Sequence, residues 1–123
     1  MAESNQECYQ TLGWIINKSE DGLFLVVADE ILQREIVRIY RQGNVGIYDY
    51  RQYPEAYSFQ TLKNWVDSYP QFQTFFIVNF QFAIQEQQAL KRLNFSRDML
   101  AGMKKNIVFF TTLQGDDMLA KEA

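Results

Sequence analysis

Two acidic residues stand directly after the most apolar stretch of the sequence. Asp29 and Glu30 follow the run from Leu23 to Ala28, an arrangement that holds magnesium and polarises the attacking water in P-loop ATPases. The same pattern is expected in any α/β domain, because an acid after a buried strand caps the following helix. Neither G-x-x-x-x-G-K-[ST] nor G-x-G-x-x-G occurs in the sequence. The residues therefore offer no cradle for a phosphate chain.

Other carboxylates could join this acidic pair at the ends of further strands. If those strands are parallel, Asp29, Asp49 and Asp116 would meet at the carboxyl edge of one sheet, where α/β domains bind ligands. A magnesium ion needs few protein ligands and prefers oxygen. An alternative function is therefore a small Mg-dependent nucleotide- or phosphate-binding domain that uses Asp29, Glu30, Asp49 and Asp116.

The composition excludes most familiar catalytic chemistry. The 123 residues contain no histidine, which excludes Ser-His-Asp and Cys-His catalysis, HExxH zinc sites and imidazole acid–base catalysis. The lone Cys8 cannot form an intrachain disulfide. A formal net charge of −3 argues against a nucleic-acid partner. We expect a non-catalytic domain with no catalytic residue, metal or cofactor.

Three tyrosines are candidates for contact with another protein. Tyr50, Tyr53 and Tyr57 surround Pro54 in a predicted loop. Aromatic side chains with polar tips are enriched in protein interfaces. Packing of this loop onto the edge of the sheet is an equally good interpretation.

A polar cluster lies in the second half of the chain. Asn94, Arg97 and Asp98 fall within the stretch Leu93–Leu100, and they could lie near a surface between domains. Such residues more commonly cap or solvate helices, which is the interpretation that the residues alone favour.

The hydrophobic pattern predicts the elements that must position these residues. Helices are expected over 4–18, 29–42, 58–69 and 85–105, the last of these either continuous or broken near Asn94, and a final helix starts at 115 or 116. Strands are expected over 23–28, 45–50, 74–78 and 106–112. Alternating strands and helices indicate βαβ units with right-handed crossovers. The prediction is one three-layer α/β domain over 1–123 with a mainly parallel sheet of about four strands, P-loop-NTPase-like or Rossmann-like without a phosphate loop.

The sequence also predicts the caps and the apolar face of the helix over 29–42 and the burial of the strand over 23–28. Asp29 should cap the start of the helix and Gly43 its end. The apolar face of this helix should contain Ile31, Leu32, Ile36, Ile39 and Tyr40. The strand over 23–28 carries no polar residue, which is typical of a strand covered on both faces.

The ends of the sequence bear on location and length. The first residues lack the basic and apolar regions of a secretory signal, and no apolar run reaches the roughly 20 residues of a membrane span. Together with the unpaired cysteine, this predicts a cytoplasmic protein that does not contact membranes. The final stretch begins like a helix without an end signal, so we expect an N-terminal piece of a longer multidomain protein.

The second half of the chain resembles a known class of bacterial protein. The residues over 93–100 and 107–112, LNFSRDML and IVFFTT, resemble a stretch near the N-terminus of large multidomain conflict and defence proteins. Their module looks like a STAND-type NTPase that has lost its P-loop. The resemblance implies a degenerate P-loop fold with Asn79 in place of the acid that ends the third strand. It also implies a signalling role through protein partners, either downstream domains of the same chain or further copies.

Overall fold

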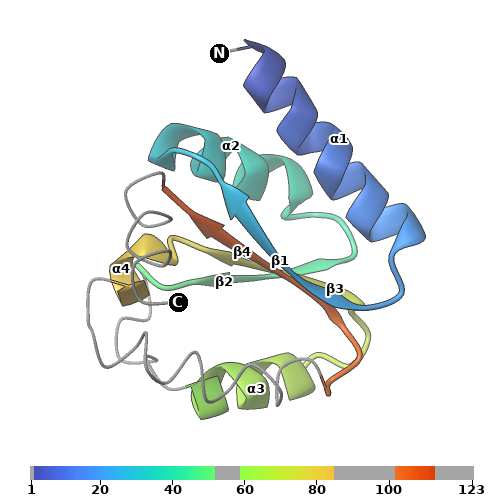
Figure 1. Ribbon diagram of the computed structural model, residues 1–123. Coiled ribbons are helices and arrows are strands. Elements are labelled where there is room, and N and C mark those ends of the chain that lie inside the picture. Colours follow the sequence, from blue (N-terminus) through green and yellow to red (C-terminus); the bar gives the residue numbers. More distant parts are fainter. Residues whose placement is uncertain (1, 52–58, 85–101, 113–123) are drawn as a thin grey trace.

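Four parallel strands form a sheet with helices on both of its faces (Figure 1). The computed structural model describes residues 2–51, 59–84 and 102–112. In chain order the elements are α1 (Ala2–Lys18), β1 (Gly22–Val27), α2 (Glu30–Tyr40), β2 (Val45–Asp49), α3 (Phe59–Asp67), β3 (Thr74–Val78), α4 (Gln81–Ile84) and β4 (Asn106–Thr111). The predicted α/β class with a four-stranded parallel sheet is confirmed.

The spatial order of the strands is β1-β4-β3-β2, and every neighbouring pair is parallel. The two central strands are buried along their whole length. Their apolar residues alternate between the two faces, as the pleat of a strand requires. In β3, Phe75 and Ile77 point to one core, and Phe76 and Val78 point to the other.

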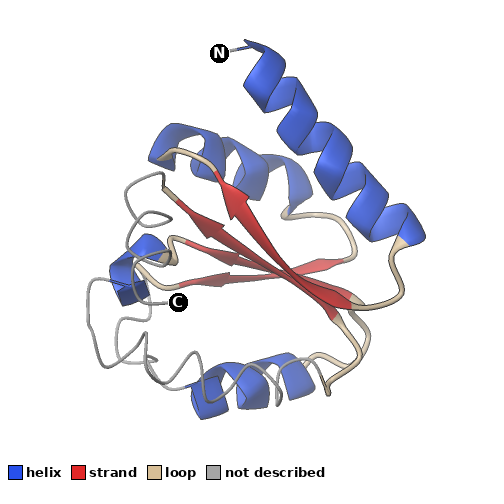
Figure 2. Cartoon of the chain, in the orientation of Figure 1, coloured by secondary structure: helices blue, strands red, loops and turns tan. Residues whose placement is uncertain are grey.

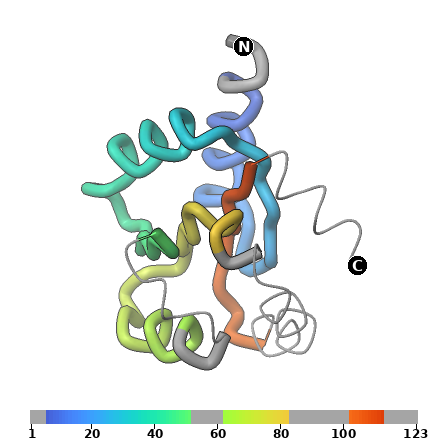
Figure 3. Tube along the Cα trace, turned by 90° about the vertical axis from the view of Figure 1, so that its left-hand side faces the viewer, coloured from blue at the N-terminus to red at the C-terminus, as the bar shows by residue number. Residues whose placement is uncertain are grey.

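Two cores lie on opposite faces of the sheet. Helices α1 and α2 cover one face and α3 covers the other, as Figure 2 and the turned view of Figure 3 show. The core under α1 and α2 contains Cys8, Leu12, Ile15, Ala28, Leu32, Ile36, Val45, Phe76, Val78, Val108 and Phe110. The core under α3 contains Tyr48, Tyr50, Leu62, Val66, Phe75, Ile77, Phe80, Ile107 and Phe109.

The prediction for β1 is wrong in one respect, because this strand lies at an edge of the sheet. Leu25 is 46% exposed and Val27 is 44% exposed, whereas both were expected to be covered. An apolar run has the same sequence pattern whether its strand is central or at an edge. The hydrophobic pattern indicates which faces of a strand are covered, but it does not indicate the position of the strand in the sheet.

Helix α2 confirms its predicted start and corrects its predicted end and face. Asp29 Oδ1 accepts a hydrogen bond of 2.7 Å from the Leu32 N–H. The helix ends at Arg41 in ordinary right-handed backbone, and no described glycine, Gly43 included, has the positive φ of a left-handed cap. Ile31 is 71% exposed, while the polar Gln33 is 1% exposed.

Asn106 anchors α1 to the amino end of the sheet. This side chain is fully buried, and its amide donates to the carbonyl oxygens of Ile15 and Ser19, at 3.3 and 3.0 Å. The Ser19 hydroxyl donates back to Asn106 Oδ1 at 2.8 Å. Carbonyls in the last turn of a helix lack partners within the helix, so Asn106 stabilises the end of α1.

The segment before β4 differs from its prediction. Residues 102–105 form turns where the helix predicted over 85–105 should continue, and Lys104 has a left-handed φ of 57°. The rest of that helix and the last predicted helix lie outside the described residues. The short α4 directly after β3 was not predicted, because four residues give no periodic signal.

Candidate functional site

Hydrogen-bonded amide side chains occupy the carboxyl end of the sheet, where parallel sheets usually bind ligands. Gln33 Nε2 donates to the Ala28 carbonyl at 2.9 Å and to Gln81 Oε1 at 3.2 Å. Gln33 Oε1 accepts a hydrogen bond of 2.7 Å from the Asn79 backbone N–H. These contacts link the end of β1 to the end of β3 and use the polar atoms that would otherwise face a ligand.

Asn79 extends this network to β2. Its side-chain Nδ2 donates to Asp49 Oδ1 at 2.7 Å, and the same Asp49 oxygen accepts from the Arg51 N–H at 2.8 Å. Asn79 has a φ of 59°, a left-handed conformation that asparagine tolerates better than most residues. The residue that follows β3 is thus an amide that holds the Asp49 carboxylate.

The strand order separates the carboxylates of the magnesium hypothesis. Because β1 and β2 lie at opposite edges, Asp29 and Asp49 follow strands that are three inter-strand spacings apart, or roughly 14 Å. Glu30 is exposed in the first turn of α2, and Asp116 lies outside the described residues. Within the described part of the chain, no group of three or more potential metal ligands is assembled. The structure does not bring Asp29 and Asp49 together.

Tyr50 lies in the core and not on an interaction surface. It is 1% exposed and packs against the rings of Tyr48 and Phe80, with centroids 5.2 and 5.7 Å away. Burial raises the pKa of the Tyr50 hydroxyl above its ordinary value. This burial contradicts the surface role predicted for Tyr50, which belongs to the core under α3. The other predicted interaction residues, Tyr53, Tyr57, Asn94, Arg97 and Asp98, lie outside the described residues.

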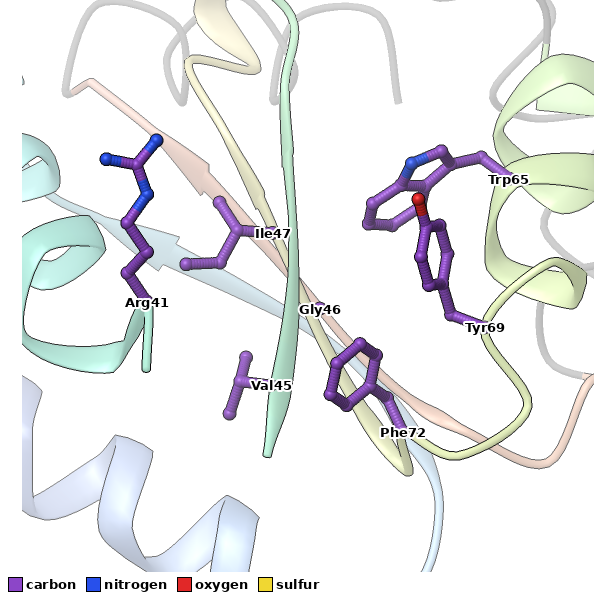
Figure 4. Close-up of a pocket in the computed structure, with 7 residues that line it drawn as sticks. All are labelled: Arg41, Val45, Gly46, Ile47, Trp65, Tyr69 and Phe72. Carbon is purple, nitrogen blue, oxygen red and sulfur yellow. The ribbon is translucent and has the colours of Figure 1, made fainter. Parts of the chain in front are cut away.

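A groove of about 240 Å³ runs along the free side of β2 (Figure 4). Figure 4 shows Arg41 and Ile47 on one side of the strand and the aromatic rings of α3 and the following turn on the other. Its lining residues are Arg41, Val45, Gly46, Ile47, Trp65, Tyr69 and Phe72. The groove was not predicted, since it exists only because β2 is an edge strand.

Glycine is required at position 46 on the floor of this groove. A Cβ atom there would lie 2.6 Å from Cδ1 of Phe75 and 3.2 Å from Cδ2 of Phe72. Phe75 is fully buried, so its ring cannot move aside without disturbing the core. The aromatic wall therefore approaches the backbone of β2 closely.

The free side of β1 presents backbone groups and apolar side chains together. The N–H groups of Gly22 and Ala28 donate to carbonyls of Lys105 and Thr111 beside β4. Backbone groups alternate in direction along a strand. The N–H and C=O groups of the odd-numbered residues Leu23, Leu25 and Val27 therefore point away from the sheet.

The residues that flank the two edge strands have opposite charges. Four exposed acids flank β1: Glu20, Asp21, Asp29 and Glu30. Two exposed arginines flank β2, with Arg41 before the strand and Arg51 after it, and the acidic last residue of the strand, Asp49, bonds to Asn79. Within the described ranges the one ion pair is Lys63–Asp67, at 2.7 Å. Asp29 caps α2 and the Arg51 guanidinium lies 6.0 Å from the centroid of the Phe82 ring, but within the described ranges no ion pair holds the charges at either edge.

Comparison with family models, with curated proteins and with solved structures found no match. In the described part of the chain, no helix has both the length and the apolar character of a membrane span. Function must therefore be inferred from the sheet, its carboxyl end and its edges.

Proposed function

We propose that the chain is a non-catalytic protein-interaction module that binds an extended segment of a partner along β1. The observation that carries this proposal is the composition of that edge. Its six residues, Gly22–Val27, are uncharged and rich in strand-forming side chains. An added strand would pair with the outward backbone groups and cover Leu25 and Val27, the mode of recognition known as β-augmentation.

Natural edge strands are usually protected against such pairing. Protection takes the form of short length, charged side chains within the strand, proline or bulges. β1 has none of these features: it pairs with β4 over all six residues without a bulge. Its only charges stand outside its ends, where they select a partner without blocking the backbone.

The flanking acids define the chemistry of the partner. Glu20 and Asp21 precede β1, and Asp29 and Glu30 follow it. An apolar segment with Lys or Arg on both sides would place cations near these carboxylates, whereas an acid-flanked segment would be repelled. Complementary charge raises the association rate and excludes wrong partners more than it adds affinity.

The carboxyl end of the sheet supports a non-catalytic role. Gln33, Asn79 and Gln81 bond to one another there, and no cationic group in these contacts would hold a phosphate. We expect Mg-ATP at millimolar concentration to leave the unfolding midpoint unchanged, since a ligand selective for the native state must raise it. A rise abolished by Asp49→Asn would instead favour the nucleotide-binding alternative.

The wider role that we propose is signalling within a bacterial multidomain protein, with defence as the biological setting. It is supported by the resemblance of the sequence to P-loop-less NTPase-like modules. A cytoplasmic location fits Cys8, a buried and unpaired cysteine, whose thiol pKa is raised by burial. Such a thiol is poorly reactive and serves as a core residue.

A peptide-binding measurement tests the proposal. The probe is a fluorescein-labelled peptide with six alternating Val and Thr residues and two lysines at each end. The control peptide carries glutamates in place of the lysines. We expect saturable binding of the lysine peptide, measured by anisotropy, that weakens as salt is added.

Two variants matched in exposure locate the binding. Leu25→Lys should abolish it, whereas Ile39→Lys, at a residue 47% exposed on α2, should not. Equal binding of both peptides, or no effect of Leu25→Lys, would contradict the proposed function.

A further inference from the structure

We infer that the partner of the β1 edge is the β2 edge of a second copy of this chain, paired in parallel and head to tail. The inference rests on the proposed function, because it names the occupant of the same edge. It is carried by the opposite charges of the two edges together with the groove along β2. One sheet would then continue from copy to copy through β2 of one and β1 of the next.

Charge argues against the simplest alternative, in which β1 pairs with β1 of another copy. Such a symmetric pair is antiparallel. Centred on Leu25, it would place Asp21 opposite Asp29 and Glu20 opposite Glu30, on both sides of the axis. Like charges directly opposite each other in a strand pair are destabilising. The acids thus disfavour this register of the symmetric pair, while a partner strand with flanking cations would neutralise them.

The β2 edge supplies those cations and a matching backbone. Arg41 lies before the strand beside the groove, and Arg51 follows it. In the parallel pair they lie at the same ends as the two acidic pairs of β1. Tyr50 N–H donates inward to Val78 O, so alternation directs the backbone groups of Val45 and Ile47 outward.

β1 has six residues and β2 has five, so every residue of β2 has a partner when the strands are aligned from their first residues. Gly22 then lies beside Val45, Leu23 beside Gly46 and Leu25 beside Tyr48. Leu23 and Tyr48 belong to the same face, since both pack with the core under α3. The groove lined by Trp65, Tyr69 and Phe72 lies beside Gly46, and we place the Leu23 side chain of the second copy there.

This pairing leaves one free edge at each end of every assembly. A head-to-tail contact of this kind is heterologous, so it forms a ring if the rotation between copies closes and an open filament if it does not. Mass should therefore increase with concentration without stopping at a dimer. A symmetric contact would stop at two copies.

Complementation between two blocked variants tests the inference. Leu25→Lys blocks the β1 edge and leaves β2 intact. The double variant Arg41→Glu/Arg51→Glu reverses the charge of the β2 edge and leaves β1 intact. Sedimentation velocity should show the wild-type chain growing with concentration and each variant associating at least about tenfold more weakly. An equimolar mixture should form a 1:1 dimer and nothing larger, because it contains one intact pair of edges.

Matched controls separate this effect from a general change in charge or solubility. Ile39→Lys adds a lysine at a residue as exposed as Leu25, and Arg34→Glu/Arg38→Glu reverses two exposed arginines on α2. Both should associate like the wild type. If a blocked variant does not unfold cooperatively, Val27→Lys, which adds the charge at the other exposed residue of the β1 edge, or Arg41→Gln/Arg51→Gln replaces it.

The outcomes distinguish this inference from the proposed function. A wild-type chain that stays monomeric at high concentration, or a β2 variant that still associates fully, overturns head-to-tail pairing. If the monomeric chain nevertheless binds the lysine-flanked peptide at Leu25, the interaction module stands and its partner is another protein. Failure of both assays rejects the module as well.

Discussion

β1 and β2 end the same parallel sheet on opposite sides, yet their surroundings differ in burial and in charge. β2 is flanked by Arg41 and the aromatic side chains of a groove, and Val45 on it is 5% exposed. β1 has acids at both ends, and Val27 on it is 44% exposed. The edges therefore differ in what selects a pairing strand: the shape of the groove together with the two arginines at β2, and the flanking acids at β1.

This difference shows two ways in which an edge strand can select the strand that pairs with it. A groove beside the strand can admit some side chains and not others, as at β2. Flanking charges can instead repel wrong partners while the backbone remains open, as at β1. The second arrangement suits a surface that must bind one partner and avoid others.

The largest effect is expected for Gly46→Ala at the β2 edge. The new Cβ would lie 2.6 Å from buried Phe75, and overpacking of this kind destabilises by about 2–3 kcal/mol. Gly13→Ala in α1 is the control, because no atom lies within 4 Å of its Cβ position. It should stabilise by about 0.5–1 kcal/mol through helix propensity. Urea unfolding measures both, and an unaffected Gly46→Ala would mean that the groove is not closely packed.

Gln33→Leu should cost about 2 kcal/mol in unfolding free energy, because it leaves buried groups without partners. Those groups are the Ala28 carbonyl and the Asn79 N–H. The substitution therefore measures how much the Gln33 hydrogen bonds at the carboxyl end of β1 contribute to stability. Gln10→Leu, at an exposed site on α1, should stay within about 0.5 kcal/mol of wild type. Equal stabilities in chemical denaturation would show that the network contributes nothing.

A single substitution made on both edges compares them directly. Val45→Thr introduces a hydroxyl at a buried position and should destabilise by about 1–2 kcal/mol. Val27→Thr changes an exposed position and should stay within about 0.5 kcal/mol. Thermal unfolding of the two variants gives the difference, and equal losses would show that the edges are alike in burial.

The smallest expected effect is a loss of stability at alkaline pH through Tyr50, the residue that follows β2. Burial raises the pKa of Tyr50 above its ordinary value of 10.0, so the folded chain holds this proton more tightly than the unfolded chain. Its stabilisation is complete below pH 10 and is lost as pH rises further. Desolvation, with a hydrogen bond to Glu35, raises the pKa of Tyr9 to about 12, which acts in the same direction.

Tyr50→Phe should reduce this alkaline loss. The Tyr50 hydroxyl has no hydrogen-bond partner in the described part of the chain, so stability at neutral pH should change by under about 1 kcal/mol. Thermal unfolding between pH 8 and 11 measures the loss, with exposed Tyr69→Phe as the control. An unchanged pH dependence would show that Tyr50 ionises as easily in the folded chain as in the unfolded one.

The sequence pattern predicted the helices and strands but not which strands lie next to each other. The helix over 4–18 and the strand over 74–78 were predicted correctly, because hydrophobic periodicity depends on residues close in sequence. The Asp29 cap was also correct, since its partner Leu32 is three residues away. Strand order depends on pairings between distant segments, which no local pattern contains.

The candidate site also depends on contacts between segments that are far apart in the sequence. Gln33 reads as a solvent-exposed position in the sequence, but it is buried because Asn79 and Gln81, far along the chain, supply its partners. Burying a polar group is tolerated only where such partners exist. Neither the apolar edge at β1 nor the groove at Gly46 could be predicted without knowing which strands end the sheet.

The order of the strands also has a consequence for synthesis on the ribosome. β1 is among the first elements to emerge, but its neighbour in the sheet is β4, so that Gly22 pairs with Asn106. Loop closure over so many residues is slow. During translation the nascent β1 therefore remains an apolar segment without its neighbouring strand until almost the whole described domain has been made.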